Sequence, residues 1–443
     1  PHGCIAHCRA ASTEGIMSGD GAVQATPEQM SQIQAMLASA GMTDGAKAPE
    51  APEDQHHAFW ETQPVAQFND DATAAEDGPI DKPLTVADVK PEPYNLPASF
   101  EWTTCDMADS ATNLEVYNLL TQNYVEDDDN MFRFDYSAPF LNWALMPPGY
   151  KKEWHVGVRV SATKKLVAFI TGIPATININ GKAMPMAEIN FLCVHKKLRA
   201  KRLAPVLIKE ITRRVNLCDI WQASYTAGVV LPKPVATCRY WHRSLNPKKL
   251  VDVGFSRLQP RMTMSRTVKL YKMPDDPATP GFRQMRDGDV PQVTALLKEY
   301  LGRDQFRLHP ELDEAEVRHW LLPRENVVNA FVVEGRDGKI TDFVSYYTLP
   351  STIIGNPQYK TLKAAYSYYN VANSISLHDL MTDALIKAQK DDFDVFNALD
   401  VMENVDMLRE LKFGIGDGNL QYYLYNWRVA QELTPQQVGL VLL

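Results

Sequence analysis

The sequence predicts an α+β protein made of two similar halves, each a β-sheet with helices on its faces. Strand-like runs alternate with amphipathic helical segments along residues 99–443, which is typical of sheets flanked by helices. In each half a meander of strands leads into a strand–turn–helix unit, which indicates a duplicated fold. The 443 residues are 45% hydrophobic and 22% charged, as in an ordinary globular protein of about two to three domains.

The N-terminal region differs from the rest in charge. Residues 1–98 hold 4 Lys+Arg and 15 Asp+Glu, a net charge of -11, whereas the remaining 41 basic and 39 acidic residues give +2. We expect residues 1–56 to form a disordered tail and residues 57–98 an arm that docks through Phe59 and Trp60. No metal site is predicted, because no common zinc spacing is matched by His2, Cys4, His7 and Cys8.

Composition also excludes several classes of protein. No apolar run reaches the roughly 18 residues that a membrane span needs, and the chain does not begin like a signal peptide. Six cysteines in 443 residues do not make a disulfide framework, so we expect a reducing compartment, the cytoplasm. The body's charge of +2 argues against a nucleic-acid binder.

The first half is expected to span residues 99–275. Apolar residues at 116, 119, 120 and 124 have the spacing of an amphipathic helix over 114–124. Asn180-Gly181 predicts a tight hairpin turn between two strands. The expected strands are Trp154–Val160, Leu166–Pro174 and Met186–Val194, followed by a helix from about Leu203 to Val215.

The second half is expected to span residues 276–443 and to repeat this pattern. Asp289 is predicted to cap a helix that carries Val293, Leu296, Leu297 and Tyr300 on one face. A hairpin is expected to turn at 336–339. The other expected elements are strands at 365–371, 393–399 and 420–427 and helices at 377–389 and 405–412.

A cluster of basic residues follows the third predicted strand. Residues 195–214 contain eight Lys+Arg and one acid, Glu210. Basic side chains around a helix N-terminus make an anion site suited to a pyrophosphate or a 3′-phosphate, and the Walker pattern of nucleotide triphosphate sites is missing. Acyl-CoA N-acyltransferases need such a turn for the CoA phosphates, with main-chain N–H groups beside it to polarise the thioester carbonyl. A solvated basic face is the alternative from composition alone.

Two long motifs carry a resemblance to a known family. Residues 188–202 read EINFLCVHKKLRAKR and residues 412–420 read KFGIGDGNL. Both resemble the signatures of the glycylpeptide N-tetradecanoyltransferases, or N-myristoyltransferases, and the resemblance covers residues 57–443. On its own the glycine run at 414–418 predicts a turn, and the resemblance implies a backbone cross-over near the peptide groove. Shorter matches are FWETQPV at 59–65, NMFRFDY at 130–136, TAGVV at 226–230 and RYWHRS at 239–244.

The resemblance implies a fold and an activity. Two acyl-CoA N-acyltransferase-like halves would pack with pseudo-two-fold symmetry around a shared mixed sheet. Residues 99–275 would bind myristoyl-CoA as co-substrate, and residues 57–98 would close over it. Residues 276–443 would form the peptide groove and end in a catalytic C-terminus. The implied reaction is transfer of myristate to an N-terminal glycine, without a prosthetic group.

The resemblance also implies the catalytic groups. The main-chain N–H groups of Phe191 and Leu192 would form the oxyanion hole, and a strand that breaks its ladder before the charged turn would leave such groups free. The carboxylate of Leu443 would be the general base. From the residues alone, the apolar segment 438–443 is more simply a packed final strand. Cys193 is expected in the core or a pocket wall, because a thioester needs no covalent enzyme intermediate.

Two sets of binding residues follow from the resemblance. The residues implied for myristoyl-CoA are His57, Ala58, Phe59, Trp60, Phe191, Leu192, Cys193, Val194, Arg199, Ala200, Lys201, Arg202, Leu203 and Ala204. Those implied for the peptide and its amine are Asn190, Thr226, Tyr124, Asp127, Asp129, Phe132, Tyr136, Tyr240, His242, Ser351, Tyr366, Asp417 and Leu420. The acidic run 126–129 would attract basic residues of the substrate.

Two other functions are weighed against this one. The same scaffold could acylate lysine or a small amine, and a comparison of glycine and alanine peptides would separate these activities. The basic run at 195–202 could bind nucleic acid, although the body carries no second basic stripe. We expect a monomer that binds myristoyl-CoA and glycine peptides but no nucleic acid.

Overall fold

The structure is a computed structural model that describes residues 57–70, 76–126 and 130–443. The predicted tail at 1–56, with its four His and Cys residues, lies outside the described residues. The strands are β1 (Phe100–Thr104), β2 (Phe132–Phe134), β3 (His155–Val160), β4 (Leu166–Ile179), β5 (Lys182–Val194), β6 (Ala223–Ala227), β7 (Ala236–Ser244), β8 (Phe282–Gln284), β9 (Leu308–Pro310), β10 (Val328–Glu334), β11 (Ile340–Thr348), β12 (Ser351–Ile353), β13 (Thr361–Leu362), β14 (Ala364–Val371), β15 (Val395–Leu399) and β16 (Gly414–Tyr425). The helices are α2 (Ser110–Asn123), α3 (Ala138–Leu145), α4 (Leu203–Asn216), α5 (Pro247–Asp252), α6 (Met264–Leu270), α7 (Val290–Leu301), α8 (Glu314–Leu321), α9 (Leu377–Lys390) and α10 (Val405–Leu408).

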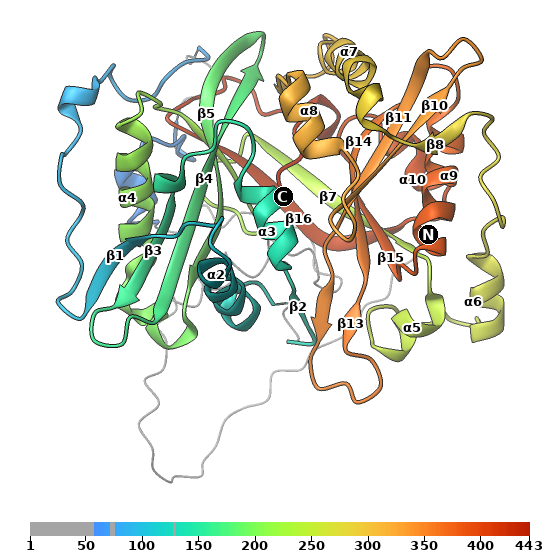
Figure 1. The fold of residues 1–443 in the computed structure, drawn as a ribbon, viewed down its shortest axis with the longest axis horizontal. Helices are drawn as coiled ribbons and strands as arrows, with labels where there is room; N and C mark the ends of the chain where they lie inside the picture. The colour runs from blue at the N-terminus through green and yellow to red at the C-terminus, as the bar shows by residue number, and fades with distance from the viewer. Residues whose placement is uncertain (1–56, 71–75, 127–129) are drawn as a thin grey trace.

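One large sheet crosses the whole molecule (Figure 1). In the described part of the chain it has 13 strands in the order β1-β3-β4-β5-β6-β16-β7-β15-β14-β11-β10-β8, with β9 paired to β4. The short strands β13, β12 and β2 form a second sheet. The first half of the chain lies on one side of Figure 1 and the second half on the other.

The strand order confirms the predicted duplication. Read from the two edges inward, β1-β3-β4-β5-β6 matches β8-β10-β11-β14-β15. In each series the pairs are antiparallel except the last, because β5 runs parallel to β6 and β14 runs parallel to β15. A helix fills each parallel crossover, α4 in the first half and α9 in the second, as such connections require. The two halves are therefore copies of one α/β unit.

The last strand of each half lies in the sheet of the other half. Strand β16, from the end of the chain, pairs with β6, and β7, from the first half, pairs with β15. The two exchanged strands pair with each other at the centre of the sheet. The division at 275/276 therefore separates two stretches of sequence, but strands from both sides of it alternate in the sheet.

Helices cover both faces of the sheet. Buried side chains of α2 and α7 belong to the large central core, whereas those of α4 and α9 pack in separate clusters. The helix predicted at about Leu203 to Val215 is α4, whose Leu203, Leu207 and Ile211 are buried as the spacing predicts. The hairpin turn is also confirmed: Asn180 (φ +49°) and Gly181 (φ +81°) have the positive φ of a type I′ turn.

Two predicted elements differ from the structure. The helix expected over 405–412 is a single turn, α10, at Val405–Leu408. The glycine segment 414–418 was expected to form a turn or a chain cross-over, but it lies in strand β16. Its pairing with β7 is interrupted between Ile415 and Asn419, so the glycines mark an irregular stretch within the strand.

Candidate active site

A β-bulge interrupts strand β5 just before the basic turn. Cys193 pairs with Phe169 and Asn190 with Thr171, so two residues of β5, Phe191 and Leu192, lie opposite a single residue of β4. Such a bulge leaves one residue outside the ladder. Phe191 has φ +54°, a left-handed conformation that non-glycine residues rarely adopt. The expected break of the ladder is therefore present at the expected residues.

The side chain of Asn190 links the bulge to the end of the chain. Its Oδ1 accepts a hydrogen bond of 2.7 Å from the Phe191 N–H, and its Nδ2 donates to the main-chain oxygen of Leu443. The Tyr124 hydroxyl lies 3.4 Å from the same Oδ1. A carbonyl that binds the Phe191 N–H must therefore displace the Asn190 oxygen.

The C-terminal segment is packed into the middle of the molecule, between the two halves (Figure 1). Val438, Leu440 and Val441 are buried, so the apolar end is not a frayed tail. The Tyr422 hydroxyl donates to the Leu440 carbonyl at 2.9 Å. The segment 438–443 is not a strand, so a packed final strand is the wrong interpretation. It is held by main-chain hydrogen bonds, such as that from the Gly439 N–H to the Leu308 carbonyl at 2.7 Å, and by hydrogen bonds with side chains of the sheet.

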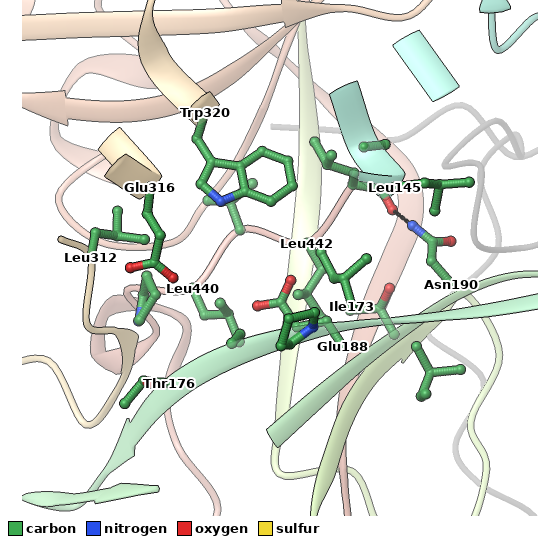
Figure 2. Close-up of a pocket in the computed structure, with 18 of the residues that line it drawn as sticks. Leu145, Ile173, Thr176, Glu188, Asn190, Leu312, Glu316, Trp320, Leu440 and Leu442 are labelled. Atoms are coloured by element: carbon green, nitrogen blue, oxygen red, sulfur yellow. Dashed lines mark hydrogen bonds between the residues drawn. The ribbon is translucent and has the colours of Figure 1, made fainter. Parts of the chain in front are cut away.

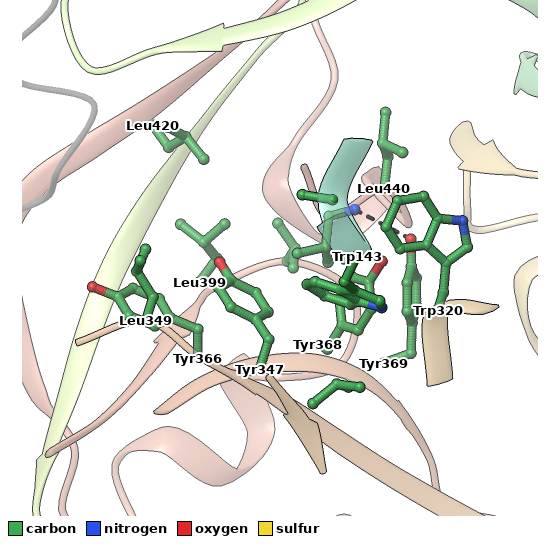
Figure 3. Close-up of a cluster of buried hydrophobic side chains, with 14 of the residues drawn as sticks. Trp143, Trp320, Tyr347, Leu349, Tyr366, Tyr368, Tyr369, Leu399, Leu420 and Leu440 are labelled. Carbon is green, nitrogen blue, oxygen red and sulfur yellow. Dashed lines mark hydrogen bonds between the residues drawn. The ribbon is translucent and has the colours of Figure 1, made fainter. Parts of the chain in front are cut away.

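Tyr369 of β14 supports the same segment. Its hydroxyl accepts a hydrogen bond of 3.3 Å from the Val441 N–H, and Figure 3 shows its ring beside Tyr368 and Leu440. Residues of β14 come from the second half and Asn190 from the first. The last residues of the chain are therefore held by both halves.

Two pockets of different character meet at the bulge. The apolar pocket, of about 200 Å³, lies between β4–β6 and α4 and is lined by side chains such as Ile170, Leu192, Ile208 and Ile211. The acidic pocket contains Glu188, Glu316 and Leu443 (Figure 2). Residues shared by both pockets are Ile189, Asn190, Phe191 and Thr226. A group bound in one pocket can therefore reach a group bound in the other only past these residues.

The arm at 57–70 closes one side of the apolar pocket. The Trp60 ring stacks on Tyr225 at 5.7 Å between ring centroids and 10° between planes, and Phe59 also lines the pocket. The Asn426 N–H donates to the Pro64 carbonyl at 2.7 Å. The structure thus places the Phe-Trp pair on the folded body, as expected. The neighbouring Ala58 is exposed, and His57 accepts a main-chain hydrogen bond from Glu61.

The basic turn forms a short 3₁₀ helix, η5 (Lys196–Lys201), directly before α4. Lys201 and Arg202 are exposed at the N-terminus of α4, where main-chain N–H groups favour an anion. Arg199 instead donates to the Asn123 carbonyl at 2.7 Å. Ala200 is exposed and Ala204 lines the apolar pocket.

Four residues of the myristoyl-CoA set lie in the core. Each is no more than 3% exposed: Phe191, Cys193, Val194 and Leu203. Burial raises the pKa of the Cys193 thiol to about 12, so the thiolate is not formed near neutral pH. The burial confirms the expectation that Cys193 lies in the core.

Apart from Asn190 and Thr226, the predicted peptide residues fall into four groups. Tyr124 and Tyr136 pack against Phe191 with ring centroids 6.0 and 5.0 Å away. A third pocket, of about 310 Å³, is lined by Phe132, His242 and Asp417. Asp127 and Asp129 lie outside the described residues. The remaining four are buried in the middle of the protein: Tyr240, Ser351, Tyr366 and Leu420.

Glu126, the first residue of the acidic run, does not have the role expected for that run. Glu126 forms ion pairs with Arg133 and Lys196, the latter at 2.6 Å. Burial alone would raise its pKa, but hydrogen bonds from Lys196 and Arg133 lower it. Glu126 is therefore committed to partners within the chain, one of them in the basic turn.

Gly416 allows strands β7 and β16 to approach each other closely beside the third pocket. A Cβ at this position would lie 2.8 Å from the Tyr240 carbonyl oxygen and against the His242 ring. His242 Nδ1 lies 2.7 Å from Asn397 Oδ1, and burial lowers the pKa of this imidazole. Burial thus favours the uncharged form of the His242 imidazole, which lines the third pocket with Asp417.

The turn before α9 occupies the same place in the second half as the basic turn in the first. Here the carboxylate of Asp342 accepts hydrogen bonds from the N–H groups of Asn373 (2.8 Å), Ser374 (2.8 Å) and Ile375 (3.3 Å). Strand β14 also bulges, because Tyr368 and Tyr369 lie opposite Ser345. The Ser345 hydroxyl bonds to both the N–H and the carbonyl of Tyr369. In the second half, therefore, Asp342 occupies the N–H groups of the turn and Ser345 occupies the main chain of the bulge.

Sequence reasoning missed the two glutamates of the acidic pocket. Glu188 lies two residues before Asn190, so both project from one face of β5, and this spacing could have revealed it. Glu316 comes from α8, which is distant in sequence, and no local signal indicates it. In the described ranges no group of three or more His, Cys, Asp or Glu side chains could hold a metal ion, and no helix is long and apolar enough to cross a membrane.

Comparisons with known proteins agree with this geometry. Residues 79–238 match the family model described as the N-terminal domain of myristoyl-CoA:protein N-myristoyltransferase, and residues 252–441 match that of its C-terminal domain. The chain belongs to the N-myristoyltransferase family.

Relatives in this family align over nearly the whole described chain. Glycylpeptide N-tetradecanoyltransferase 1 of Arabidopsis thaliana is 64% identical over 389 residues, which are 87% of this chain and 89% of the relative. A probable glycylpeptide N-tetradecanoyltransferase of Caenorhabditis elegans is 50% identical over 440 residues, 97% of each chain. The crystal structure of Saccharomyces cerevisiae N-myristoyltransferase with bound myristoyl-CoA is similar to this N-myristoyltransferase fold with a TM-score of 0.84 and 45% identity, covering 88% of this chain and all of that one.

Proposed function

We propose that this member of the N-myristoyltransferase family transfers a myristoyl group from myristoyl-CoA to the N-terminal glycine amine of a peptide. The observation that carries the proposal is the meeting of an apolar and an acidic pocket at Asn190, Phe191 and Thr226. The apolar pocket suits an acyl chain, and the acidic pocket suits an ammonium group. The thioester carbonyl and the amine then meet at the bulge.

The acyl chain supplies most of the donor's affinity in this account. Burying a CH₂ group is worth about 0.8 kcal/mol, so fourteen carbons contribute on the order of 10 kcal/mol. Phe59 and Trp60 cover the pocket after the donor binds. Lys201 and Arg202 hold CoA phosphates at the N-terminus of α4, where the helix dipole adds to their charge.

The bulge acts on the thioester carbonyl. When the carbonyl enters, its oxygen takes the place of Asn190 Oδ1 and accepts from the N–H groups of Phe191 and Leu192. The negative charge that develops on this oxygen is stabilised there. The amide side chain of Asn190 is then free to hold the incoming amine, together with Thr226.

The carboxylate of Leu443 removes the proton. An α-amino group has a pKa of roughly 7.7–8.0 and a carboxylate one near 3.5, so in water the carboxylate is a weak base for this ammonium. Desolvation between the halves raises the pKa of the carboxyl group and lowers that of the amine, which narrows the difference between the two pKa values. The amine then attacks the carbonyl carbon, the C–N bond forms, and the C–S bond breaks. The second amine proton goes to the leaving thiolate of CoA.

The peptide chain follows the second half of the protein in this account. The wall behind the amine is formed by Tyr124, Tyr136, Tyr240, Ser351, Tyr366 and Leu420. A later part of the substrate enters the third pocket, where it contacts Phe132, His242 and Asp417. Asp127 and Asp129 attract basic residues of the peptide.

A mass-spectrometric assay tests the proposal. The protein is incubated with myristoyl-CoA and an octapeptide that begins with glycine, and the matched controls begin with alanine or with acetylglycine. The expected result is a myristoyl adduct on the glycine peptide alone. Equal modification of an acetylglycine peptide that contains lysine would favour the lysine acyltransferase and contradict the proposal. Decanoyl- and palmitoyl-CoA in the same assay measure selection of chain length.

A further inference from the structure

Glu188 is a titratable group at the junction of the two halves that the mechanism above does not use. It lies two residues before Asn190 on the same face of β5 and lines the acidic pocket with Leu443. Figure 2 shows it in the middle of this pocket, between Asn190 on one side and Glu316 and Thr176 on the other. Its carboxyl forms no hydrogen bond or ion pair with the described residues, so it is free to exchange a proton.

The pocket holds both the end of the chain and exposed residues. Asn190 and Leu443 line it, and so do Thr176 and Glu311, which are exposed. Glu188 therefore shares one cavity with the proposed base and with residues that face bulk water. Trp320 and Tyr369 line the same cavity.

The described titratable side chains around Glu188 include no basic group. Among the described residues, the titratable side chains that line the pocket are Glu188, Glu311 beyond β9, Glu316 of α8, and Tyr368 and Tyr369 of β14, and none of these is basic. Burial, and secondarily the charge of Glu188, raise the pKa of Tyr368 and Tyr369, which lie close to it. A positive charge or a proton is thus stabilised in this pocket.

The reaction releases one proton that must leave. An ammonium and a thioester become an amide, a thiol and H⁺, and the proton first sits on the Leu443 carboxylate. We propose that Glu188 takes this proton from Leu443 and passes it through the acidic pocket to solvent, a step that rests on the proposed function. The bond broken is O–H of the Leu443 carboxyl and the bond formed is O–H of Glu188. The next turnover begins when Glu188 has lost this proton to water.

The pKa of Glu188 suits a group that transfers a proton. Burial, and secondarily the charge of Glu316, raise the pKa of this carboxyl to about 8. A group that moves a proton works best when its pKa lies near the working pH. This value is close to the roughly 7.7–8.0 of an α-amino group, the group that loses the proton.

The pH profile of two variants tests the proposal. For the wild type, kcat with both substrates saturating rises through an ionisation near pH 8, where Glu188 becomes able to accept a proton. Glu188→Gln keeps the shape of the side chain but cannot accept, so kcat falls by about 10-fold or more and this ionisation disappears. Affinity for myristoyl-CoA, measured by calorimetry, stays unchanged.

Glu316→Gln is the matched variant. Gln keeps the hydrogen bond that residue 316 accepts from the Asp313 N–H at 2.9 Å, so α8 keeps its capping box. It removes the charge that, after burial, raises the pKa of Glu188, so the ionisation moves to lower pH. A profile in Glu188→Gln like that of the wild type overturns the proposal. If Glu188→Gln does not fold, an unmoved ionisation in Glu316→Gln overturns it instead. Absence of transfer by the wild type at every pH contradicts the proposed function itself.

Discussion

The amide of Asn190 joins the bulge of β5 to the last residue of the chain. Its Oδ1 accepts a hydrogen bond from the N–H of Phe191, and its Nδ2 donates one to the main-chain oxygen of Leu443. These two groups belong to the site of the carbonyl and to the site of the base in the proposed reaction. One side chain therefore sets the distance between them.

Replacement of Asn190 by alanine should slow the chemical step. The Leu443 oxygen loses its partner, and losing a hydrogen bond of this kind costs about 1–3 kcal/mol, or roughly 5- to 150-fold in rate. Single-turnover quench measurements would give the rate of amide formation. Asn373→Ala, an exposed asparagine of the second half, is the control. Equal rates for both variants would mean that Asn190 does not organise the reaction.

Removal of the Trp60 ring should weaken binding of myristoyl-CoA. This indole stacks on Tyr225 at the edge of the apolar pocket, so Trp60→Ala opens the pocket to water. We expect Kd to rise about 10-fold, or about 1.4 kcal/mol, by calorimetry. Trp60→Phe keeps an aromatic face and should recover most of the affinity. An unchanged Kd for Trp60→Ala would show that the arm does not cover the donor.

Asp342→Asn should destabilise the second half in a pH-dependent way. Burial alone would raise the pKa of Asp342, but hydrogen bonds from Ser374, Thr341 and main-chain N–H groups lower it below the ordinary value. The stability from this carboxylate is therefore present above the unfolded pKa of about 3.9 and is lost as pH falls through the lower, folded value. We expect a loss of about 2 kcal/mol at pH 7, since bonds to charged groups are worth about 1.5–3 kcal/mol.

Urea unfolding at several pH values measures this effect. The difference between the wild type and Asp342→Asn should stay constant from pH 7 to about pH 5 and shrink below about pH 4. Asp287→Asn, which removes an exposed carboxylate paired with Arg318, should change stability by less than about 1 kcal/mol. A difference that grows in acid would contradict the assignment.

Gly416→Ala should impair the third pocket without affecting the donor. The new Cβ would lie 2.8 Å from the Tyr240 carbonyl oxygen, so β16 or the His242 ring must move. Overpacking of this kind costs about 1–3 kcal/mol. We expect the KM of the peptide to rise and the Kd of myristoyl-CoA to stay the same. The control is Gly288→Ala, because a Cβ at Gly288 has no atom within 4 Å. Equal peptide KM values for the two variants would exclude this pocket from the peptide's path.

Much of the fold could be predicted because its signals are local. The apolar spacing of α4 and the Asn180-Gly181 turn each depend on a few neighbouring residues. The repeated order of elements indicated the duplication. The exchange of β7 and β16 could not be predicted, because strand order depends on contacts between residues far apart in the sequence.

In the candidate site, too, the features that depend on neighbouring residues could be predicted, and those that depend on residues far apart in the sequence could not. The bulge at Phe191 and the Phe59-Trp60 contact follow from continuous motifs, and the structure contains both. The acidic pocket joins Glu188 to Glu316 across 128 positions, and neither residue has a local pattern that indicates the other. The glycine segment 414–418 was misassigned because its glycines serve a close approach between strands and not a turn. Long-range packing is the information that the sequence alone did not provide.

The rate of amide formation in a variant extended by one alanine beyond Leu443 shows whether the carboxylate of Leu443 removes the proton of the amine that attacks at the bulge. Chemical quench in a single turnover should show a fall of about 100-fold or more in this rate, with an unchanged Kd for myristoyl-CoA. Amide formation at the wild-type rate would show that another group is the base.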